Sequence, residues 1–325
     1  MTRTSSRHPV RAFVLLAAVA ALATTLLAAC GRSSTDGTVT FPTVVTLGKG
    51  DLFPSILNQS LGVGSNRVSI GLTDSDGGKV LGASLHVQFY DLNSGKPILK
   101  AQSDARFIPI ELSYIDERSG NAPTPTGRDG VYVVNTSFDE AGTWGMAVTV
   151  TRNGKTGKPI PYRFNVLPRT PEAEVGDPAP PSRQKTLADV QNISEIDSSN
   201  PPRPSMHNMT VADALATHKP IVLAFASPAF SQSRLGAPVM DTIMDPLSAK
   251  YAGRAMFIHI EPYDLKALRQ SNTYVPVPAM QQWSLQDEPW IFVIDRSGRI
   301  EAKFEGIVAL DEVEAALQRA LTSSP

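Results

Sequence analysis

The sequence predicts two domains, an all-β sandwich followed by an α/β domain. A chain of 325 residues suits two domains of ordinary size better than one. Between residues 41 and 167, short alternating stretches of apolar residues are separated by turn clusters, a pattern typical of antiparallel strands. Residues 168–185 are rich in Pro, Glu and Ser, and the apolar runs after them are of the buried-strand type. We therefore predict a linker at 168–185 and an α/β domain at 186–325.

The first 29 residues are typical of an export signal peptide. Three arginines precede an uncharged apolar run over residues 12–29. The run ends in Leu27-Ala28-Ala29-Cys30, which resembles the lipobox cut by the lipoprotein signal peptidase. An uncleaved transmembrane helix with a chance cysteine is the alternative.

The lipobox resemblance implies cleavage between Ala29 and Cys30, with a diacylglyceryl group on the Cys30 sulfur. A further acyl chain such as palmitate on the new amino terminus would add to the several chains that durable anchoring needs. We therefore expect a lipoprotein of the cell envelope, whose partner is the lipid bilayer of the cell membrane on the extracytoplasmic side. Residues 30–40, rich in Ser, Thr and Gly, would form a flexible tether.

Cysteine content and charge exclude several functions. Cys30 is the only cysteine, so lipid on its sulfur would leave the mature chain without a thiol or a disulfide. The 30 basic and 31 acidic residues are scattered along the chain and give a net charge of -1. A nucleic-acid partner is therefore not expected.

The predicted sandwich contains one informative hairpin. Tyr132 lies in a strand before a corner and Trp144 begins the strand after it, which resembles the last hairpin of immunoglobulin-like envelope domains. That resemblance implies an immunoglobulin-like sandwich over residues 41–167, with both aromatic residues in its core. Residues 113–128, which include Pro123 and Pro125, are expected to form a long loop. The expected strands cover residues 67–72, 84–92, 130–138, 144–151 and 162–167.

The α/β domain is expected to alternate strands and helices. Thr210 is placed to cap a short helix, and a longer helix is predicted over residues 232–251, kinked at a proline. The last helix is predicted over residues 310–321. The expected strands cover residues 220–226, 255–260, 289–295 and 300–304.

From about residue 175 to residue 321 the chain resembles the thioredoxin-like superfamily. The resemblance is carried by Val-Gly-Asp-Pro-Ala-Pro at 175–180, by the apolar run at 219–225 and by Asp-Glu-Pro-Trp-Ile-Phe-Val-Ile at 287–294. It implies that Pro289 is the cis-proline that faces the active-site turn, where free backbone groups can pair with an extended ligand.

The turn that would carry thioredoxin chemistry lacks its cysteines. Related exported proteins have roughly Phe-Cys-x-Ser-Arg-x-Cys-Gly-Pro-Val, and this chain places Ser231 and Gly236 at the two cysteine positions. A shorter spacing would place Phe230 and Ser233 there instead. A serine hydroxyl stays protonated at neutral pH and forms no exchangeable bond of the disulfide kind. We therefore predict no catalytic residue and no cofactor.

Two functions from different classes follow from the same turn. The favoured one is a redox-inactive thioredoxin-like module for binding or scaffolding, in which Ser231, Gln232, Ser233 and Arg234 at a helix N-terminus form a polar groove for an anion, an extended peptide or an envelope protein partner. Alternatively, the serines merely cap the helix of a relic site. The second function is a thioredoxin-like oxidoreductase of the cell envelope.

Metal binding is a lesser hypothesis. Met206, His207 and Met209 are ligand types that hold Cu(I) outside the cytoplasm, although methionines before a helix more often pack in a core. His259 and Glu261 share one face of a strand end, but two ligands make a poor metal site. We therefore expect no metal centre and a hydrogen-bonded His259.

Overall fold

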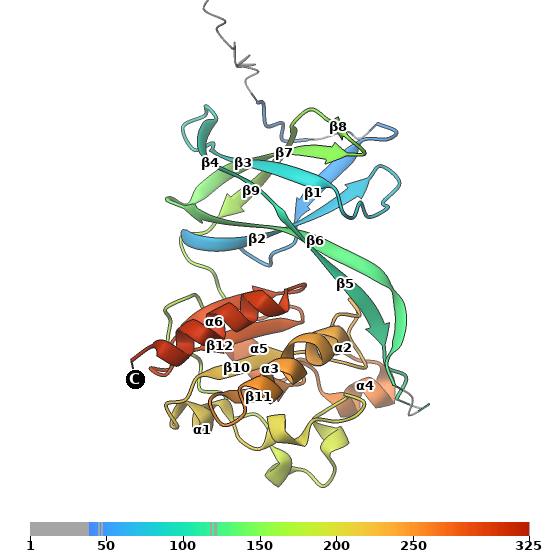
Figure 1. Ribbon diagram of the computed structural model, residues 1–325, viewed down its shortest axis with the longest axis vertical. Helices are drawn as coiled ribbons and strands as arrows, with labels where there is room; N and C mark the ends of the chain where they lie inside the picture. The colour runs from blue at the N-terminus through green and yellow to red at the C-terminus, as the bar shows by residue number, and fades with distance from the viewer. Residues whose placement is uncertain (1–38, 45, 47, 118, 120–121, 325) are drawn as a thin grey trace, which may run out of the picture. The chain divides into compact units, whose positions relative to one another are not determined.

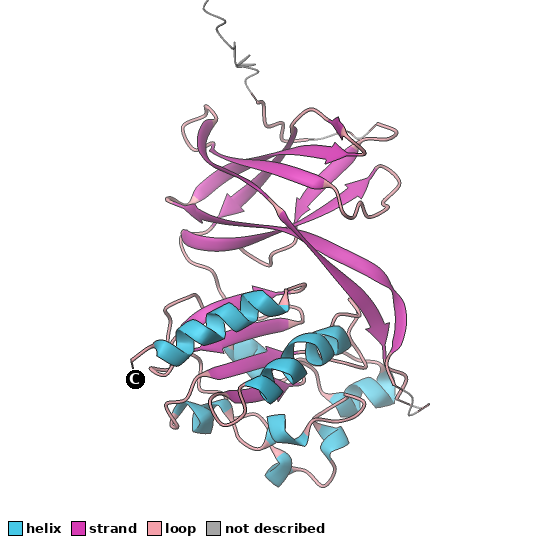
Figure 2. Ribbon diagram, viewed as in Figure 1, coloured by secondary structure: helices cyan, strands magenta, loops and turns pink. Residues whose placement is uncertain are grey.

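The structure is a computed structural model that describes residues 39–44, 46, 48–117, 119 and 122–324 (Figure 1). The predicted signal peptide, the lipidation site Cys30 and most of the predicted tether lie outside the described residues. Residues 39–325 form one unit, which holds a β-rich part followed by an α/β part, each with cores of its own. The two-part order agrees with the sequence prediction (Figure 2).

The β-rich part is made of two antiparallel sheets. One sheet has the order β1-β2-β6-β5, and the other has the order β4-β3-β7-β8, with β9 also paired to β7. Val68 of β2 lies opposite Val134 of β6, and Ile70 lies opposite Tyr132. The strands are β1 (Leu52–Ile56), β2 (Gly64–Asp74), β3 (Ser84–Asp91), β4 (Ile98–Asp104), β5 (Arg106–Tyr114), β6 (Thr124–Phe138), β7 (Gly142–Arg152), β8 (Lys155–Thr156) and β9 (Ile160–Val166).

One core lies between the two sheets, because alternate side chains of β2, β3, β6 and β7 point into it. Both aromatic residues of the predicted hairpin are buried there, as expected. The Tyr132 hydroxyl donates to the Val80 carbonyl at 2.8 Å, and Trp144 Nε1–H donates to the Glu140 carbonyl at 3.1 Å. Each buried ring therefore keeps a partner for its polar atom.

Part of the loop predicted at residues 113–128 is strand. β5 ends at Tyr114 and β6 begins at Thr124, so these two strands form a long ribbon that extends past the rest of the sheet (Figure 1). Ser113 pairs with Pro125 beyond an irregularity in the register. Pro125 and Gly127 predict a break in a strand, but the antiparallel partner β5 and the bulge accommodate both residues.

The α/β part has a four-stranded mixed sheet with the order β11-β10-β12-β13. β10 is parallel to β11 and antiparallel to β12, and β13 is antiparallel to β12. This order and these directions are those of a thioredoxin-like domain. The strands are β10 (Ile221–Phe225), β11 (Met256–Ile260), β12 (Trp290–Ile294) and β13 (Ile300–Glu305).

Helices cover both faces of this sheet. Every residue of β10 is therefore buried, whichever face its side chain lies on. Along one face lie the segment from α2 to α3 and helix α6, and along the other lie α1 and α5. The expected helix over 232–251 begins only at residue 236 and is π-helical in its middle. The helices are α1 (Val211–Leu215), α2 (Gly236–Val239), η4 (Met240–Met244), α3 (Asp245–Lys250), α4 (Leu265–Ser271), α5 (Pro278–Gln282) and α6 (Leu310–Thr322).

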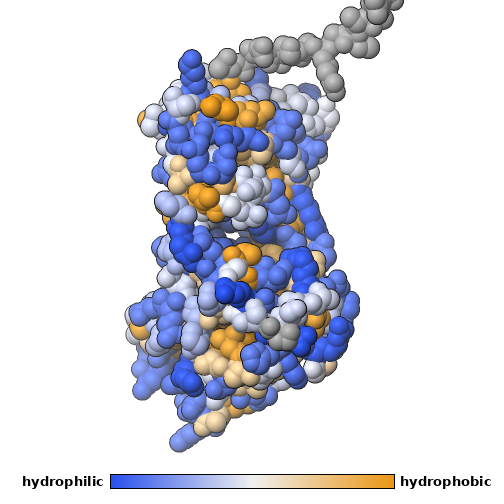
Figure 3. All heavy atoms as spheres, turned by 90° about the vertical axis from the view of Figure 1, so that its left-hand side faces the viewer, coloured by the Kyte–Doolittle hydropathy of each residue, from blue (hydrophilic) through white to orange (hydrophobic). Residues whose placement is uncertain are grey.

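The segment predicted as a linker, residues 168–185, connects the two parts and also packs on the α/β part. The Ala179 amide donates to the Gly298 carbonyl at 2.9 Å, and the Ala179 side chain lies in the core under α1 and α5. In the described residues, no helix has both the length and the apolar character needed to cross a membrane. Figure 3 shows one face of the molecule, on which hydrophilic side chains predominate and apolar ones form small separate patches.

Candidate functional site

The turn between β10 and α2 occupies the place where a thioredoxin-like domain carries its cysteines. The Ser231 and Ser233 hydroxyls are 2.9 Å apart, and the Ser231 amide donates to the Ser227 carbonyl at 2.9 Å. Ser231 to Arg234 lie before α2, whose N-cap is Leu235. The Leu235 amide donates to Ser233 Oγ at 3.4 Å, and no predicted groove residue makes a side-chain hydrogen bond to the amides inside α2.

Gly236, at the second cysteine position, has no room for a side chain. A Cβ atom at this residue would lie 2.3 Å from the Ser227 carbonyl oxygen and 3.1 Å from the Pro228 nitrogen. Both atoms belong to the backbone, so they cannot move aside as a flexible side chain could. The turn therefore requires glycine at the position where a redox-active relative would need a sulfur.

The segment before β12 faces this turn. The Glu288–Pro289 peptide bond is cis, and Pro289 directly precedes β12. The Ser227 amide donates to Glu288 Oε2 at 3.4 Å, which connects the segment to the end of β10. The sequence resemblance identified Pro289 but gave no role to the carboxyl group beside it.

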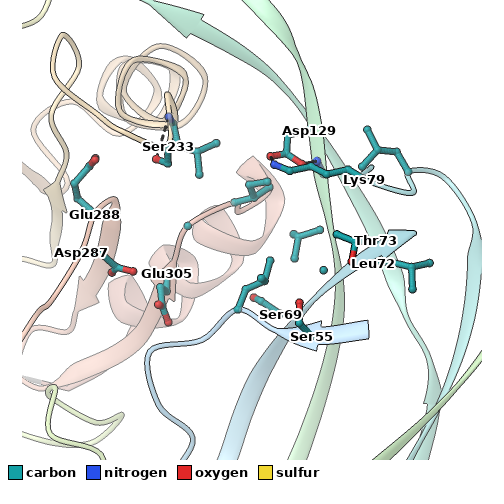
Figure 4. A pocket seen from close by; sticks show the side chains of 18 residues that line it. Ser55, Ser69, Leu72, Thr73, Lys79, Asp129, Ser233, Asp287, Glu288 and Glu305 are labelled. Carbon is teal, nitrogen blue, oxygen red and sulfur yellow. Dashed lines mark hydrogen bonds and ion pairs between the residues drawn. The ribbon is translucent and has the colours of Figure 1, made fainter. Parts of the chain in front are cut away.

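Three acidic residues, Asp287, Glu288 and Glu305, line the same cavity next to the turn (Figure 4). Burial raises the pKa of Glu288 to about 7, against hydrogen bonds that Ser231 and the Ser227 amide donate to it. Burial raises the pKa of Glu305 to about 8, although the Gln59 amide donates to both carboxylate oxygens at 2.8 and 2.9 Å. Burial also raises the pKa of Asp287.

These carboxyl groups line a cavity of about 260 Å³ between the α/β part and the sheet that contains β1 and β2. In Figure 4, Ser233 and the three carboxyl groups lie on one side of it, and Ser55, Ser69 and Thr73 lie on the other. Lys79 and Asp129 form an ion pair at its rim. The acidic side of the cavity disfavours the anion that the sequence analysis considered for the polar groove.

The β5–β6 ribbon packs beside the turn, whose Gln232, Ser233 and Arg234 remain exposed. Ile115, which follows β5 and is 2% exposed, packs with Ala229 and Ala237 and against Phe230. Nearer the sheet, apolar side chains of the ribbon form a second buried cluster with Leu235 of the turn and with Ile307. The face on which a thioredoxin-like domain would receive an extended peptide is thus contacted by the chain's own β-rich part.

Ion pairs hold the two parts together beside this contact. Arg67 of β2 makes two hydrogen bonds of 2.8 and 2.9 Å to the carboxylate of Glu312 in α6. Arg106 of β5 pairs with Asp311 at 2.8 and 2.9 Å. The Arg67 and Glu312 side chains are 10% and 14% exposed, whereas those of Arg106 and Asp311 are 54% and 66% exposed.

The structure does not bring together the three residues of the copper hypothesis. Met206 packs in the core on one face of the sheet, and Met209 packs against the core on the other face. His207 is buried beside a residue that the sequence analysis did not consider, Asp197, with 3.3 Å between its Nε2 and Asp197 Oδ2. Copper binding through Met206, His207 and Met209 is therefore not supported, because the sulfur atoms point into separate cores.

His259 and Glu261 lie where the end of β11 approaches the turn. The Ser227 hydroxyl donates to Glu261 Oε2 at 2.9 Å, and the Ser198 amide donates to Oε1 at 2.7 Å. Burial raises the pKa of Glu261 to about 8. His259 Nε2 pairs with the Ala226 carbonyl at 2.8 Å, so the expected hydrogen bond of this histidine is present at one of its two nitrogens.

Comparisons with known proteins add little to this geometry. No family model and no curated protein matches the chain. A putative thiol:disulfide interchange protein DsbE from Chlorobium tepidum matches 46% of this chain and 99% of its own, with 19% identity and a TM-score of 0.31. The structure of MTB dsbF in its mixed oxidized and reduced forms matches 35% of this chain and 88% of its own, with 15% identity and a TM-score of 0.27. The thioredoxin-like topology accordingly rests on the strand order and directions given above.

Proposed function

We propose that the protein is a lipoprotein of the cell envelope, anchored through lipid on Cys30, whose thioredoxin-like domain is a redox-inactive module for binding or scaffolding. The β-rich part is proposed to be an immunoglobulin-like sandwich. Its two sheets, with the orders β1-β2-β6-β5 and β4-β3-β7-β9, support that assignment, because immunoglobulin-like domains pair their strands in this way.

The observation that carries the proposal is the packing of the β5–β6 ribbon on the turn. Thiol–disulfide exchange needs an attacking thiolate and open access to it. Here the turn has Ser231 and Gly236 at the cysteine positions, and the buried Ile115 contacts Ala229 and Ala237 on either side of them. The turn then serves to hold the two parts in contact, which is a scaffolding role.

The ligand class follows from the cavity beside the turn. The carboxyl groups of Asp287, Glu288 and Glu305 on its wall favour a partner that brings a positive charge, because a nearby cation would favour the ionised form of Glu288 and Glu305 over the protonated form that burial favours. The opposite wall offers the hydroxyl groups of Ser55 and Ser69. We therefore propose a cationic or donor-rich group, such as a lysine or arginine side chain of an envelope protein, as the occupant.

The anchoring is tested by mass spectrometry of the full chain extracted from membranes. The proposal predicts an amino-terminal peptide that begins at Cys30 and carries a diacylglyceryl group, and a Cys30→Ser variant that leaves the membrane fraction. An unprocessed amino terminus with a free thiol would contradict it.

The binding role is tested in intact cells with a photoactivatable residue at Leu57, which lines the cavity and is 51% exposed. A matched control carries the same residue at Val275, which is 45% exposed and does not line the cavity. The proposal predicts protein adducts at Leu57 that decrease in a Glu288→Gln, Glu305→Gln variant. Equal adducts at both positions, or none at Leu57, would argue against it.

A further inference from the structure

Three side chains of metal-binding type meet in the interior of the α/β part, outside the cavity described above. Asp197 follows a short 3-10 helix (Ile193–Glu195), His207 ends another (Pro204–His207), and His259 lies in β11. They are 2%, 3% and 1% exposed. Each offers one ligand atom, and these atoms lie within 4.8 Å of one another.

His259 presents an unpaired nitrogen to this cluster. Its Nε2 lies 2.8 Å from the Ala226 carbonyl oxygen, which can only accept, so Nε2 carries the proton of the neutral imidazole. Its Nδ1 is 3.7 Å from Asp197 Oδ1, too far for a hydrogen bond, and finds no hydrogen-bond partner among the described residues. Histidines that bind metals commonly donate their second nitrogen to a backbone carbonyl in this way.

His207 also presents an unpaired nitrogen to Asp197. Its Nε2 is 3.3 Å from Asp197 Oδ2, and it also lacks a hydrogen-bond partner of acceptable geometry in the described part of the chain. Two buried imidazole nitrogens therefore face one carboxylate without making hydrogen bonds to it. An unsatisfied buried polar atom is costly, and two in one cluster indicate that a further atom completes the arrangement.

Among the described residues, no arginine or lysine side chain pairs with the carboxylate of Asp197. The Ser199 amide donates to Oδ1 at 2.8 Å and the Arg203 amide donates to Oδ2 at 2.7 Å. The Arg203 guanidinium turns instead to Asp241 and to Asp245, with an Nε–Oδ1 distance of 2.8 Å to the latter. A positive charge beside Asp197 must come from a protonated imidazole or from a bound cation.

The distances fit a bound ion. Two ligand atoms that each lie about 2.0–2.1 Å from a tetrahedral Zn²⁺ are about 3.3–3.4 Å apart. The shortest separations from Asp197 to the two imidazoles are 3.3 Å from Oδ2 to His207 Nε2 and 3.7 Å from Oδ1 to His259 Nδ1, which are near this spacing for a carboxylate that faces the ion with both oxygens. Two imidazoles and one carboxylate are a common zinc ligand set, and the set contains no sulfur that would favour Cu(I).

We propose that Asp197, His207 and His259 form a buried binding site for a divalent transition-metal ion, with Zn²⁺ as the ion of best fit. The ion would connect the segment that holds Asp197 and His207 to strand β11, next to the turn at Ser227. Burial of all three ligands makes this a structural site, which exchanges its ion slowly and only when the segment opens.

The test uses the full chain in detergent, stripped of metal with a chelator, reloaded with Zn²⁺ and freed of unbound ion. We expect about one Zn²⁺ per chain by elemental mass spectrometry and a melting temperature about 5 °C or more above that of the stripped protein. Co²⁺ in place of Zn²⁺ is expected to give the visible absorption of a tetrahedral site.

The variants Asp197→Asn and His207→Ala, His259→Ala are expected to lose the bound metal and the rise in melting temperature. His86→Ala is the control, because His86 lies in β3 and pairs with Asp104 far from the cluster in the fold. If the variants fail to fold, the wild-type measurement still decides. Folded wild-type protein that retains far less than one ion per chain, or variants that bind as much metal as wild type, would overturn the proposal.

Discussion

A Cβ atom at Gly236 would lie 2.3 Å from the carbonyl oxygen of Ser227. The backbone of the turn thus leaves no space for a side chain at the position where a redox-active relative would have its second cysteine. Restoring thioredoxin chemistry would require a different backbone as well as two sulfur atoms.

The first prediction concerns this contact. Gly236→Ala should lower the melting temperature by about 5–10 °C, because relieving a clash with backbone atoms costs roughly 2–3 kcal/mol. Gly157→Ala is the control, because a Cβ there meets only the Val150 carbonyl oxygen at 3.6 Å. Differential scanning calorimetry of both variants checks this. Equal melting temperatures would mean that the turn can open.

The second prediction concerns the ribbon. Ile115→Ala should destabilise the protein by about 2–4 kcal/mol, because it leaves a cavity against Ala229 and Ala237. It should also speed cleavage of the ribbon by proteases. The neighbouring Tyr114 is 45% exposed, so Tyr114→Ala should change stability by less than about 1 kcal/mol. If limited proteolysis cleaves the ribbon at the same rate in both variants, the stability of the ribbon does not depend on its contact with the turn.

The third prediction compares two ion pairs that join different strands of one sheet, β2 and β5, to the same helix α6. Arg67→Ala should cost about 3 kcal/mol, because it leaves the shielded Glu312 carboxylate without its partner. Arg106→Ala should cost less than about 1 kcal/mol, because its pair with Asp311 is exposed to solvent. Thermal unfolding of the two variants measures the difference, and a larger loss for Arg106→Ala would refute this ranking.

The fourth prediction is a dependence of stability on pH. Glu305 has a pKa of about 8 in the folded protein, above its ordinary value of 4.5, so the folded state binds more protons than the unfolded state between these values. Stability should therefore fall as the pH rises from about 4.5 to 8, and Glu288, with a pKa of about 7, should add to the fall.

Glu305→Gln should reduce this fall, because the amide cannot ionise and keeps an oxygen that accepts from the Gln59 amide. Melting temperatures of wild type and variant at pH 5 and pH 8 check the prediction. The melting temperature of the variant relative to that of wild type should be higher at pH 8 than at pH 5. A parallel pH dependence in both would show that Glu305 does not titrate in this range.

Much of the fold could be predicted from local patterns. Alternating apolar residues predicted β3 and β7, and a continuous apolar run predicted β10. Tyr132 and Trp144 are core residues, because their side chains point to the inner face of their sheets. The ribbon was missed, since Pro125 and Gly127 are accommodated by pairing with β5, which no local pattern reports.

The candidate sites were harder to predict, because their residues come from distant segments. Asp287 and Glu305 come together only through the pairing of β12 with β13, and Gln59 of the β-rich part bonds to Glu305 and to the amide of Gln286. Asp197 lies in a stretch rich in Ser and Pro with no periodic pattern, so nothing local connects it with His207 or His259. The one available signal was that the cluster takes two of the chain's five histidines, His207 and His259.

The most direct test is a disulfide-exchange measurement on the full chain extracted from membranes in detergent. Insulin reduction by dithiothreitol would be followed with and without the protein, alongside the Ser231→Ala variant. We predict the same uncatalysed rate in all three cases, because the turn supplies no thiolate. A protein-dependent acceleration that disappears in Ser231→Ala would contradict it.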